Sequence, residues 1–278
     1  MTRALWSALR RARYALPGIA GRMLPAPDAA AVLKRGTRLH RRGIGTALGY
    51  FHDDAADAAT VAEANLAALA LAKSQPGDRY LSLKAPALGF DARRIRDIAE
   101  AAKAAGMAIV FDAHAPGQAD ATLDLAEALL AEHPATGCAL PARWRRSPAD
   151  AMRFRDLSAP LRLVKGEWAD AEADPEDIAS AYLDLTARLA GRAAPVAVAS
   201  HDLALVERAL GLLLAAGTPC TLEQLRGLPR RRTTAIARRL GGPVRLYLPF
   251  GPGWWPYALN QALARPHLIA AHLKDIAA

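Results

Sequence analysis

Short apolar runs alternate with longer alanine-rich segments along most of the chain. The short runs are continuously apolar, which is typical of strands buried on both faces of a parallel sheet. The longer segments are bounded by carboxylates, glycines and prolines, as helices are. The pattern predicts strands over residues 44–49, 79–84, 107–112, 137–140, 161–166, 195–200, 218–222 and 244–249.

A helix is predicted after each of these strands, and another precedes the first one. The long helix that ends near Lys73 has Asp53 and Asp54 as its candidate caps. The other predicted helices cover residues 29–41, 91–105, 119–132, 148–156, 175–189, 203–215, 230–240 and 255–264.

The repeating unit is one strand followed by one helix, at a spacing of about 30 residues. Parallel strands need crossover helices, so this alternation predicts an α/β fold. Eight such units close most economically into a (β/α)8 barrel, which typically needs about 250 residues. A doubly wound open sheet is the alternative, but no Gly-rich phosphate loop follows the first strand. We therefore predict one barrel domain over residues 29–278, preceded by a short helical arm over residues 1–28.

The chain carries a net charge of +9, which makes nucleic acid, an anionic membrane or an acidic ligand conceivable partners. No nucleic-acid motif accompanies the arginines, so we expect a solvated basic surface and no nucleic-acid partner. The basic arm lacks the continuous apolar core of a secretory signal and resembles an amphipathic helix. Prolines and glycines interrupt the longest uncharged run, so no transmembrane helix is expected. The amphipathic arm would either pack on the body of the protein or rest on a membrane surface. Cys138 and Cys220 lie far apart and form no disulfide framework, so we expect a cytoplasmic protein, with peripheral membrane contact as an option.

Candidate chemistry lies where the predicted strands end, because barrel active sites gather at the carboxyl ends of the strands. The strand over 161–166 is unusual, since Arg162 and Lys165 interrupt an otherwise apolar run. Cations in excess over carboxylates favour an anionic ligand, such as a phosphate-bearing cofactor, although each cation could instead form a structural ion pair. No metal-site spacing, nucleophile elbow or Walker loop is present. The strand-end residues are Tyr50, Lys84, Asp112, Pro141, Arg162 with Lys165, His201, Gln224 and Tyr247.

Several of these segments resemble motifs of the proline dehydrogenases, which are flavoenzymes with a (β/α)8 barrel. The most specific matches are RLVKGEW at residues 162–168 and YLPFG at residues 247–251. Supporting matches follow the family order: SLK at 82–84, ASHD at 199–202, LRGL at 225–228, WWPY at 254–257 and ARP at 264–266.

The resemblance implies an FAD cofactor at the mouth of the barrel. Arg162 would approach the flavin ring near N5, and Lys165 would hold polar atoms of the cofactor. Ser200 and His201 would contact the cofactor from the sixth strand. A fixed cation near N5 is reasonable chemistry, because it stabilises the negative charge of a reduced flavin.

The resemblance also implies a reaction. A hydride would pass from the carbon beside a secondary amine to flavin N5, and the electrons would then pass to a membrane quinone. The small-molecule substrate would be proline or a related cyclic or secondary amine. Catalytic roles fall on Arg162, Lys84, Asp112 and Tyr247. The substrate pocket is predicted to include Glu167, Trp168, Leu225, Tyr257, Asn260 and Gln261.

The chain departs from the family pattern in the helix that usually binds the substrate carboxylate. Asn260 and Gln261 stand where the family has an arginine pair, and an amide binds a carboxylate more weakly than such a pair does. Proline itself is therefore in question as the substrate. Other family positions also differ: Pro141 replaces a flavin-contacting glutamine, Ala264 and Tyr50 replace glutamates, and Glu167 and Trp168 replace a small residue and a tyrosine.

Two other functions fit the sequence. The departures favour a non-catalytic barrel that acts as a binding or regulatory protein. The excess of cations is compatible with a barrel that acts on a phosphorylated or other anionic metabolite without flavin. Arginines 143, 145 and 146 follow the fourth strand and form either a solvated loop or a contact to cofactor phosphates.

Overall fold

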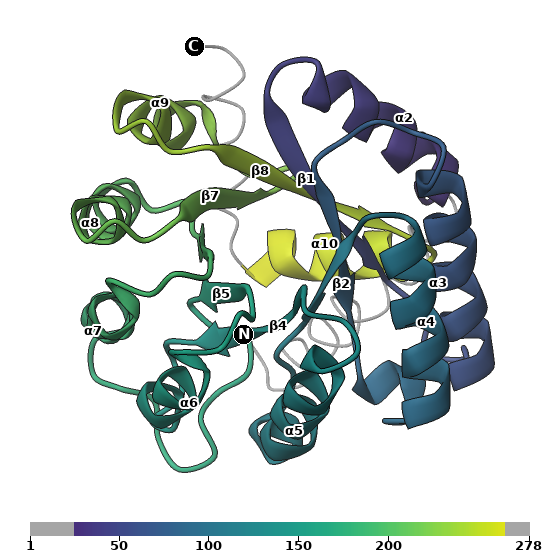
Figure 1. Cartoon of the computed structure of the whole chain (residues 1–278), viewed down its shortest axis with the longest axis horizontal. Helices are drawn as coiled ribbons and strands as arrows, with labels where there is room; N and C mark the ends of the chain where they lie inside the picture. Colours follow the sequence, from purple (N-terminus) through teal and green to yellow (C-terminus); the bar gives the residue numbers. More distant parts are fainter. Residues whose placement is uncertain (1–24, 265–278) are drawn as a thin grey trace, which may run out of the picture.

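The computed structural model describes residues 25–264 and shows eight parallel strands that close into a barrel (Figure 1). The strands follow one another around the barrel in chain order, and β8 pairs with β1. The predicted (β/α)8 barrel is confirmed; most of the predicted basic arm lies outside the described residues. The strands are β1 Ile44–Tyr50, β2 Arg79–Leu83, β3 Ala108–Phe111, β4 Thr136–Pro141, β5 Leu161–Val164, β6 Val196–Ala199, β7 Cys220–Leu225 and β8 Val244–Phe250.

Helices surround the barrel, and their positions match the predicted ones to within a few residues. The structure adds two short 3-10 helices in the loops after β2 and β3, at Pro86–Leu88 and Pro116–Gln118. The α-helices are α2 Ala29–His40, α3 Ala58–Ala72, α4 Ala92–Ala104, α5 Ala119–Leu130, α6 Ser147–Phe154, α7 Ile178–Leu189, α8 Leu203–Ala215, α9 Arg231–Arg239 and α10 Trp254–Ala264.

Aspartate caps start several of these helices, because a carboxylate can accept the free N–H groups of the first turn. The candidate caps for α3, Asp53 and Asp54, were wrong. Asp57 caps this helix by accepting from the N–H of Thr60, whereas Asp53 accepts from the N–H of Ala55 within the preceding loop.

The main hydrophobic core lies between the outer face of the barrel and the surrounding helices. Outward-facing strand residues such as Leu48, Leu81 and Ile109 are fully buried against buried helix residues such as Ile95 and Ile98. The interior of the barrel holds a smaller and more polar set of side chains. Burial of apolar surface is therefore concentrated outside the barrel, which leaves its interior able to hold charged groups.

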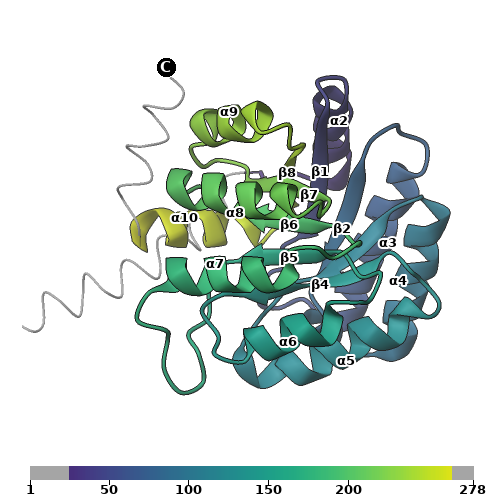
Figure 2. The ribbon, with the colours of Figure 1, turned by 60° about the vertical axis from the view of Figure 1, so that its left-hand side comes forward.

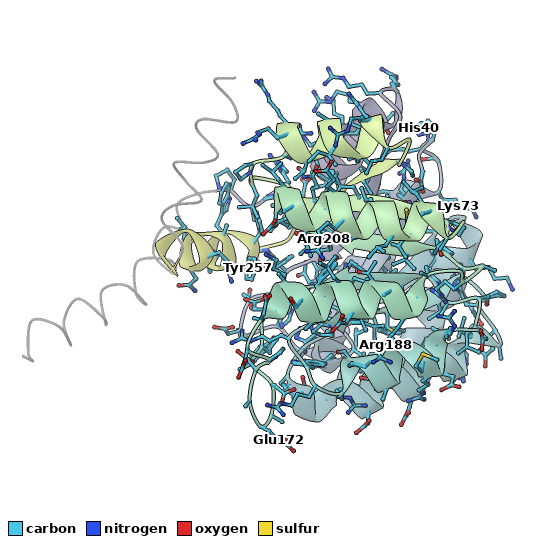
Figure 3. The ribbon with its side chains drawn as sticks, turned by 90° about the vertical axis from the view of Figure 1, so that its left-hand side faces the viewer. His40, Lys73, Glu172, Arg188, Arg208 and Tyr257 are labelled. Atoms are coloured by element: carbon cyan, nitrogen blue, oxygen red, sulfur yellow. The ribbon has the colours of Figure 1, made fainter. Side chains whose placement is uncertain are left out.

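The last described helix, α10, differs from the others because it lies at one end of the barrel rather than along its side (Figure 2). Tyr257 on α10 marks this end, which is the carboxyl end of the strands, while His40, Lys73 and Arg188 lie towards the opposite end (Figure 3). Among the described helices, none is both long enough and apolar enough to span a bilayer.

The close approach of β4 to the loop before β5 makes Gly137 a sensitive position. A Cβ atom at Gly137 would lie 1.7 Å from the carbonyl oxygen of Pro160, and backbone cannot rotate away as a side chain can. Gly137→Ala should lower the free energy of unfolding by about 3 kcal/mol or more, as severe overpacking does. Gly211→Ala in α8 is the control, because a Cβ there meets nothing within 4 Å and alanine favours a helix. Urea denaturation of both variants tests the difference, and equal stabilities would contradict the packing described.

Candidate active site

The strand register determines which side chains point into the barrel. Tyr80 and Ser82 on β2 are two residues apart and therefore lie on the same face. Cross-strand pairing places Tyr80 beside Ala47 and Ala108, which also face inwards. The same alternation on the other strands brings Arg162 of β5, Glu223 of β7 and Tyr247 of β8 into the interior.

Asp112, directly after β3, is the centre of a polar cluster near the carboxyl end of the barrel. Its Oδ2 atom lies 3.0 Å from the ammonium of Lys84 and 3.5 Å from the hydroxyl of Tyr247. Its Oδ1 atom accepts hydrogen bonds from the Arg162 guanidinium and the Ser82 hydroxyl. Three of the predicted residues, Lys84, Arg162 and Tyr247, are thus brought together around the carboxylate of a fourth, Asp112.

The electrostatics of this cluster favour its charged forms. Burial alone would raise the pKa of Asp112, but the charges of Lys84 and Arg162 and the Ser82 hydrogen bond outweigh it and hold this pKa well below its usual range. Burial opposes the charge of Lys84, yet Tyr247 and Asp112 raise its pKa. Burial and the Asp112 charge raise the pKa of Tyr247. At neutral pH, Asp112 is therefore ionised, and Lys84 and Tyr247 keep their protons.

Arg162 extends this cluster deeper into the barrel. Its Nη1 atom lies 3.1 Å from the Ser82 hydroxyl, 3.2 Å from the Tyr80 hydroxyl and 3.5 Å from Glu223. Tyr80 in turn donates a 2.6 Å hydrogen bond to Glu223. The guanidinium also lies 5.6 Å from the centre of the Tyr247 ring. Arg162 is therefore held between Asp112, towards the carboxyl end of the barrel, and Glu223 and Tyr80, towards the amino end.

Sequence reasoning missed Tyr80 and Glu223 and selected Gln224 instead. Its predicted seventh strand ended at residue 222, whereas β7 extends to Leu225. Neighbouring strand residues point to opposite faces, so Glu223 faces the interior and Gln224 faces outwards, where it accepts a hydrogen bond from Thr234 of α9. The alternation along a correctly placed strand is the signal that would have found Glu223.

Lys165 and His201 lie away from the Asp112 cluster. Lys165 is 46% exposed and forms a 3.3 Å ion pair with Asp202, at the start of α8. His201 accepts from the N–H of Leu225 at 3.0 Å through Nε2, and its Nδ1 lies 2.8 Å from the carbonyl of Pro229. This imidazole links the loops after β6 and β7. Ser200 is buried and accepts from the N–H of Asp202. The predicted convergence of five charged residues thus divides into an inner and an outer group.

Aromatic side chains cover the inner group. The Lys84 ammonium lies 4.3 Å from the centre of the Phe51 ring, just after β1. Phe51 also contacts Trp254 and Tyr257 of α10, with ring centres 5.5 Å and 5.0 Å apart. These contacts hold α10 over the carboxyl end of the barrel.

Three of the six predicted pocket residues lie together at this aromatic cover, and the other three do not. Glu167 in the loop after β5 accepts a 2.8 Å hydrogen bond from Gln261 of α10 and lies 3.5 Å from the Tyr257 hydroxyl. Leu225 packs with the interior residues, whereas Asn260 and the half-exposed Trp168 face outwards. Glu167, Tyr257 and Gln261 therefore form one contact at the mouth, although they are far apart in sequence.

The arginines after β4 are occupied within the described loops. Arg143 pairs with Asp174, Arg146 pairs with Asp120 and Asp150, and Arg145 donates to the carbonyl of Ala173. This network links α6 to the loops around it. Within residues 25–264, no group of three or more His, Cys, Asp or Glu side chains could hold a metal ion.

A closed parallel barrel with a buried polar cluster at its carboxyl end has the architecture of a (β/α)8-barrel enzyme. The sequence profile described as "Proline dehydrogenase" matches residues 32–253. The chain belongs to the proline dehydrogenase family, and it is a proline dehydrogenase-like oxidoreductase.

Individual relatives agree with this assignment. Proline dehydrogenase 1 of Bacillus subtilis (strain 168) is 27% identical over 264 residues, covering 88% of this chain and 86% of the relative. Proline dehydrogenase of Deinococcus radiodurans is 26% identical over 279 residues, covering 92% and 89%. The solved structure of proline utilization A from Bdellovibrio bacteriovorus, inactivated by N-propargylglycine, has the same fold, with a TM-score of 0.75 at 15% identity. It covers 86% of this chain, which spans only 32% of that longer protein.

Removing the carboxylate of Asp112 should lower the free energy of unfolding. Asp112→Asn leaves Lys84 and Arg162 buried without this counter-charge, which typically costs about 3–5 kcal/mol. The native carboxylate contributes stability above its unfolded pKa, near 3.8, and loses that contribution as the pH falls towards the lower folded value. The variant should therefore be less stable at neutral pH and lose less stability on acidification.

Urea denaturation across a pH series measures both effects. Asp120→Asn is the control, since Asp120 also pairs with an arginine but is exposed, and its loss should change stability little. Equal effects of the two substitutions would show that Asp112 does not balance buried charge.

Proposed function

We propose that this protein is an FAD-dependent oxidoreductase that transfers a hydride from the carbon beside a secondary amine to flavin N5. The substrate class is proline or a related cyclic amine. The cluster of Lys84, Asp112, Arg162 and Tyr247 carries this proposal, because it gathers fixed charge at the end of the barrel where barrel enzymes bind substrates.

The residues at the mouth fit an electron-rich cofactor. Lys84 and Arg162 offer two cations, and electrostatic stabilisation of developing negative charge needs such preorganised groups. Two buried ring nitrogens beside them, Nδ1 of His52 and Nε2 of His114, have no hydrogen-bond partner among the described residues. Buried polar atoms normally find a partner, so a polar ligand would complete these two.

The protonation states fit hydride transfer better than proton abstraction by the protein. Lys84 and Tyr247 keep their protons at neutral pH, and Asp112 is a very weak base because its pKa is so low. None of the three is tuned to remove a proton from carbon. FAD supplies the hydride acceptor when bound, and the cluster would orient the substrate and hold a fixed charge distribution around it.

The structure of α10 bears on the substrate. The family's arginine pair is replaced by Asn260 and Gln261, and the Gln261 amide already donates to Glu167. A substrate carboxylate would have to compete with Glu167 for that amide, without the attraction of an arginine pair. We therefore propose a substrate that lacks a carboxylate, such as a simple cyclic amine. A membrane quinone is the proposed electron acceptor, as the family resemblance implies.

A second function, a non-catalytic binding barrel, is favoured by one observation. Arg162 is already paired with Asp112 and Glu223, and Phe51 covers Lys84 beneath α10. A cofactor would have to share these cations with their present partners.

Flavin binding separates the two functions. The purified protein should show flavin absorbance when titrated with FAD, and Arg162→Gln should weaken FAD binding about tenfold or more through loss of a charged contact. Arg153→Gln is the matched control, because Arg153 pairs with Asp124 and Glu127 on the surface. A correctly folded native protein that leaves the FAD spectrum unchanged would favour the non-catalytic barrel.

Substrate class is tested by anaerobic bleaching of the FAD-loaded protein. Pyrrolidine should bleach it with a higher kcat/KM than proline does. Gln261→Arg should raise kcat/KM for proline about tenfold or more by restoring one cation. Gln75→Arg in the loop after α3, at the other end of the barrel, controls for added charge. Faster turnover of proline than of pyrrolidine by the native protein would refute the carboxylate-free substrate.

A further inference from the structure

A cavity of about 410 Å³ opens at the amino end of the barrel, opposite α10. Its rim includes residues that immediately precede strands, namely Asp78 before β2, Ala135 before β4 and Pro195 before β6. This is the end towards which His40, Lys73 and Arg188 lie in Figure 3. The volume lies within the range of roughly 300–1,000 Å³ that is typical of small-molecule sites.

The cavity exists because the lowest interior layer of the barrel is made of small residues. In most (β/α)8 barrels, bulky branched side chains fill these layers. Here Ala108, Ala197 and Thr221 occupy inward positions of β3, β6 and β7, and all three line the cavity. They are only partly buried, although they lie within the barrel. The interior is therefore open to a ligand from the amino end.

The charged groups that line the cavity are predominantly cationic. Arg79, Arg162 and Arg245 line it together with one acidic residue, Asp78. Arg79 donates to the backbone carbonyls of Gln75 and Pro76. Arg162 is already paired with Asp112 and Glu223, so Arg245 is the lining cation that could receive an anion.

Arg245 is the group best placed to bind such an anion. Its Nη2 atom alone contacts Asp78, at 2.7 and 2.8 Å from the two carboxylate oxygens. A guanidinium has five N–H donors, so this single-nitrogen contact leaves donors for a second carboxylate. The group is further positioned 5.0 Å from the centre of the Tyr80 ring. Beside it, the Thr221 hydroxyl has no hydrogen-bond partner among the described residues.

The cavity is separate from the mouth but adjoins the same polar network. Tyr80 and Arg162 form part of its wall, and these residues bond to each other and to Glu223. On the side facing the mouth, Arg162 pairs with Asp112. An anion at the amino end would therefore lie beneath the Asp112 cluster without occupying it.

We propose that the amino-terminal cavity is a second small-molecule site, which binds a small organic carboxylate through Arg245. The apolar part of the ligand would contact Ala108, Val110 and Ala197, and the Thr221 hydroxyl would donate to the carboxylate. This site does not depend on FAD or on the identity of the amine substrate.

Thermal denaturation with propionate as the probe tests the proposal. Propionate should raise Tm saturably relative to chloride at matched ionic strength, and propylammonium should not. Arg245→Gln should weaken propionate binding about tenfold or more. Arg239→Gln is the control, because it removes an arginine from an exposed ion pair with Glu207, and it should leave propionate binding unchanged.

Ala197→Leu provides an independent test, because its larger side chain would fill the cavity without removing a charge. This variant should lose the propionate effect while still binding FAD at the opposite end. Thr221→Val keeps the volume and should weaken binding less than Arg245→Gln does. A cavity that holds only water, shown by no saturable propionate effect, would overturn the proposal, as would binding that survives both Arg245→Gln and Ala197→Leu.

Discussion

The carboxylate of Asp112 balances two cations that reach it from different parts of the barrel. Lys84 follows β2 and Arg162 lies on β5, so without a shared counter-charge they would repel each other in a poorly solvated interior. The Ser82 hydroxyl and the Tyr247 ring complete this environment. Ser82 and Lys84 come from β2 and its end, and the other members come from the end of β3, from β5 and from β8. The charge balance therefore depends on the closed barrel, which brings these strands together.

The polar layer around Arg162 divides the interior of the barrel into two regions with different properties. On the carboxyl side, Phe51 and the aromatic residues of α10 cover the Asp112 cluster. On the amino side, alanines and a threonine leave open space. Glu223 and Tyr80 form the boundary, because both bond to Arg162 from below. A single buried arginine therefore contacts both regions, through Asp112 on the carboxyl side and as part of the cavity wall on the amino side.

The barrel could be predicted from sequence because continuous apolar runs and helix boundaries are local signals that repeat at a regular spacing. The inner cluster was partly predictable for the same reason: Lys84 and Asp112 directly follow strands. Glu223 was missed because the predicted seventh strand ended at residue 222, whereas β7 continues to Leu225. The inward-facing positions after residue 222 were therefore not considered. The contact between Glu167 and Gln261 depends on how α10 lies over the barrel, and no local pattern specifies that placement. His201 illustrates the same limit, since its bonds to the backbone of Leu225 in β7 and of Pro229 in the loop after it are set by tertiary structure.

Helix α10 is attached to the barrel differently from the strands, and this affects what a substitution in the helix can change. The hydrogen-bonded frame is complete when β8 pairs with β1 at Phe250, before α10 begins. The helix is then attached by ring contacts to Phe51 and by bonds such as that from the Trp255 indole to the carbonyl of Pro25. The closed strand ladder of the barrel therefore does not include α10, whereas Glu167 at the mouth bonds directly to Gln261 of this helix. A substitution on the inner face of α10 should thus act first on the contacts at the mouth and leave the pairing of the eight strands in place.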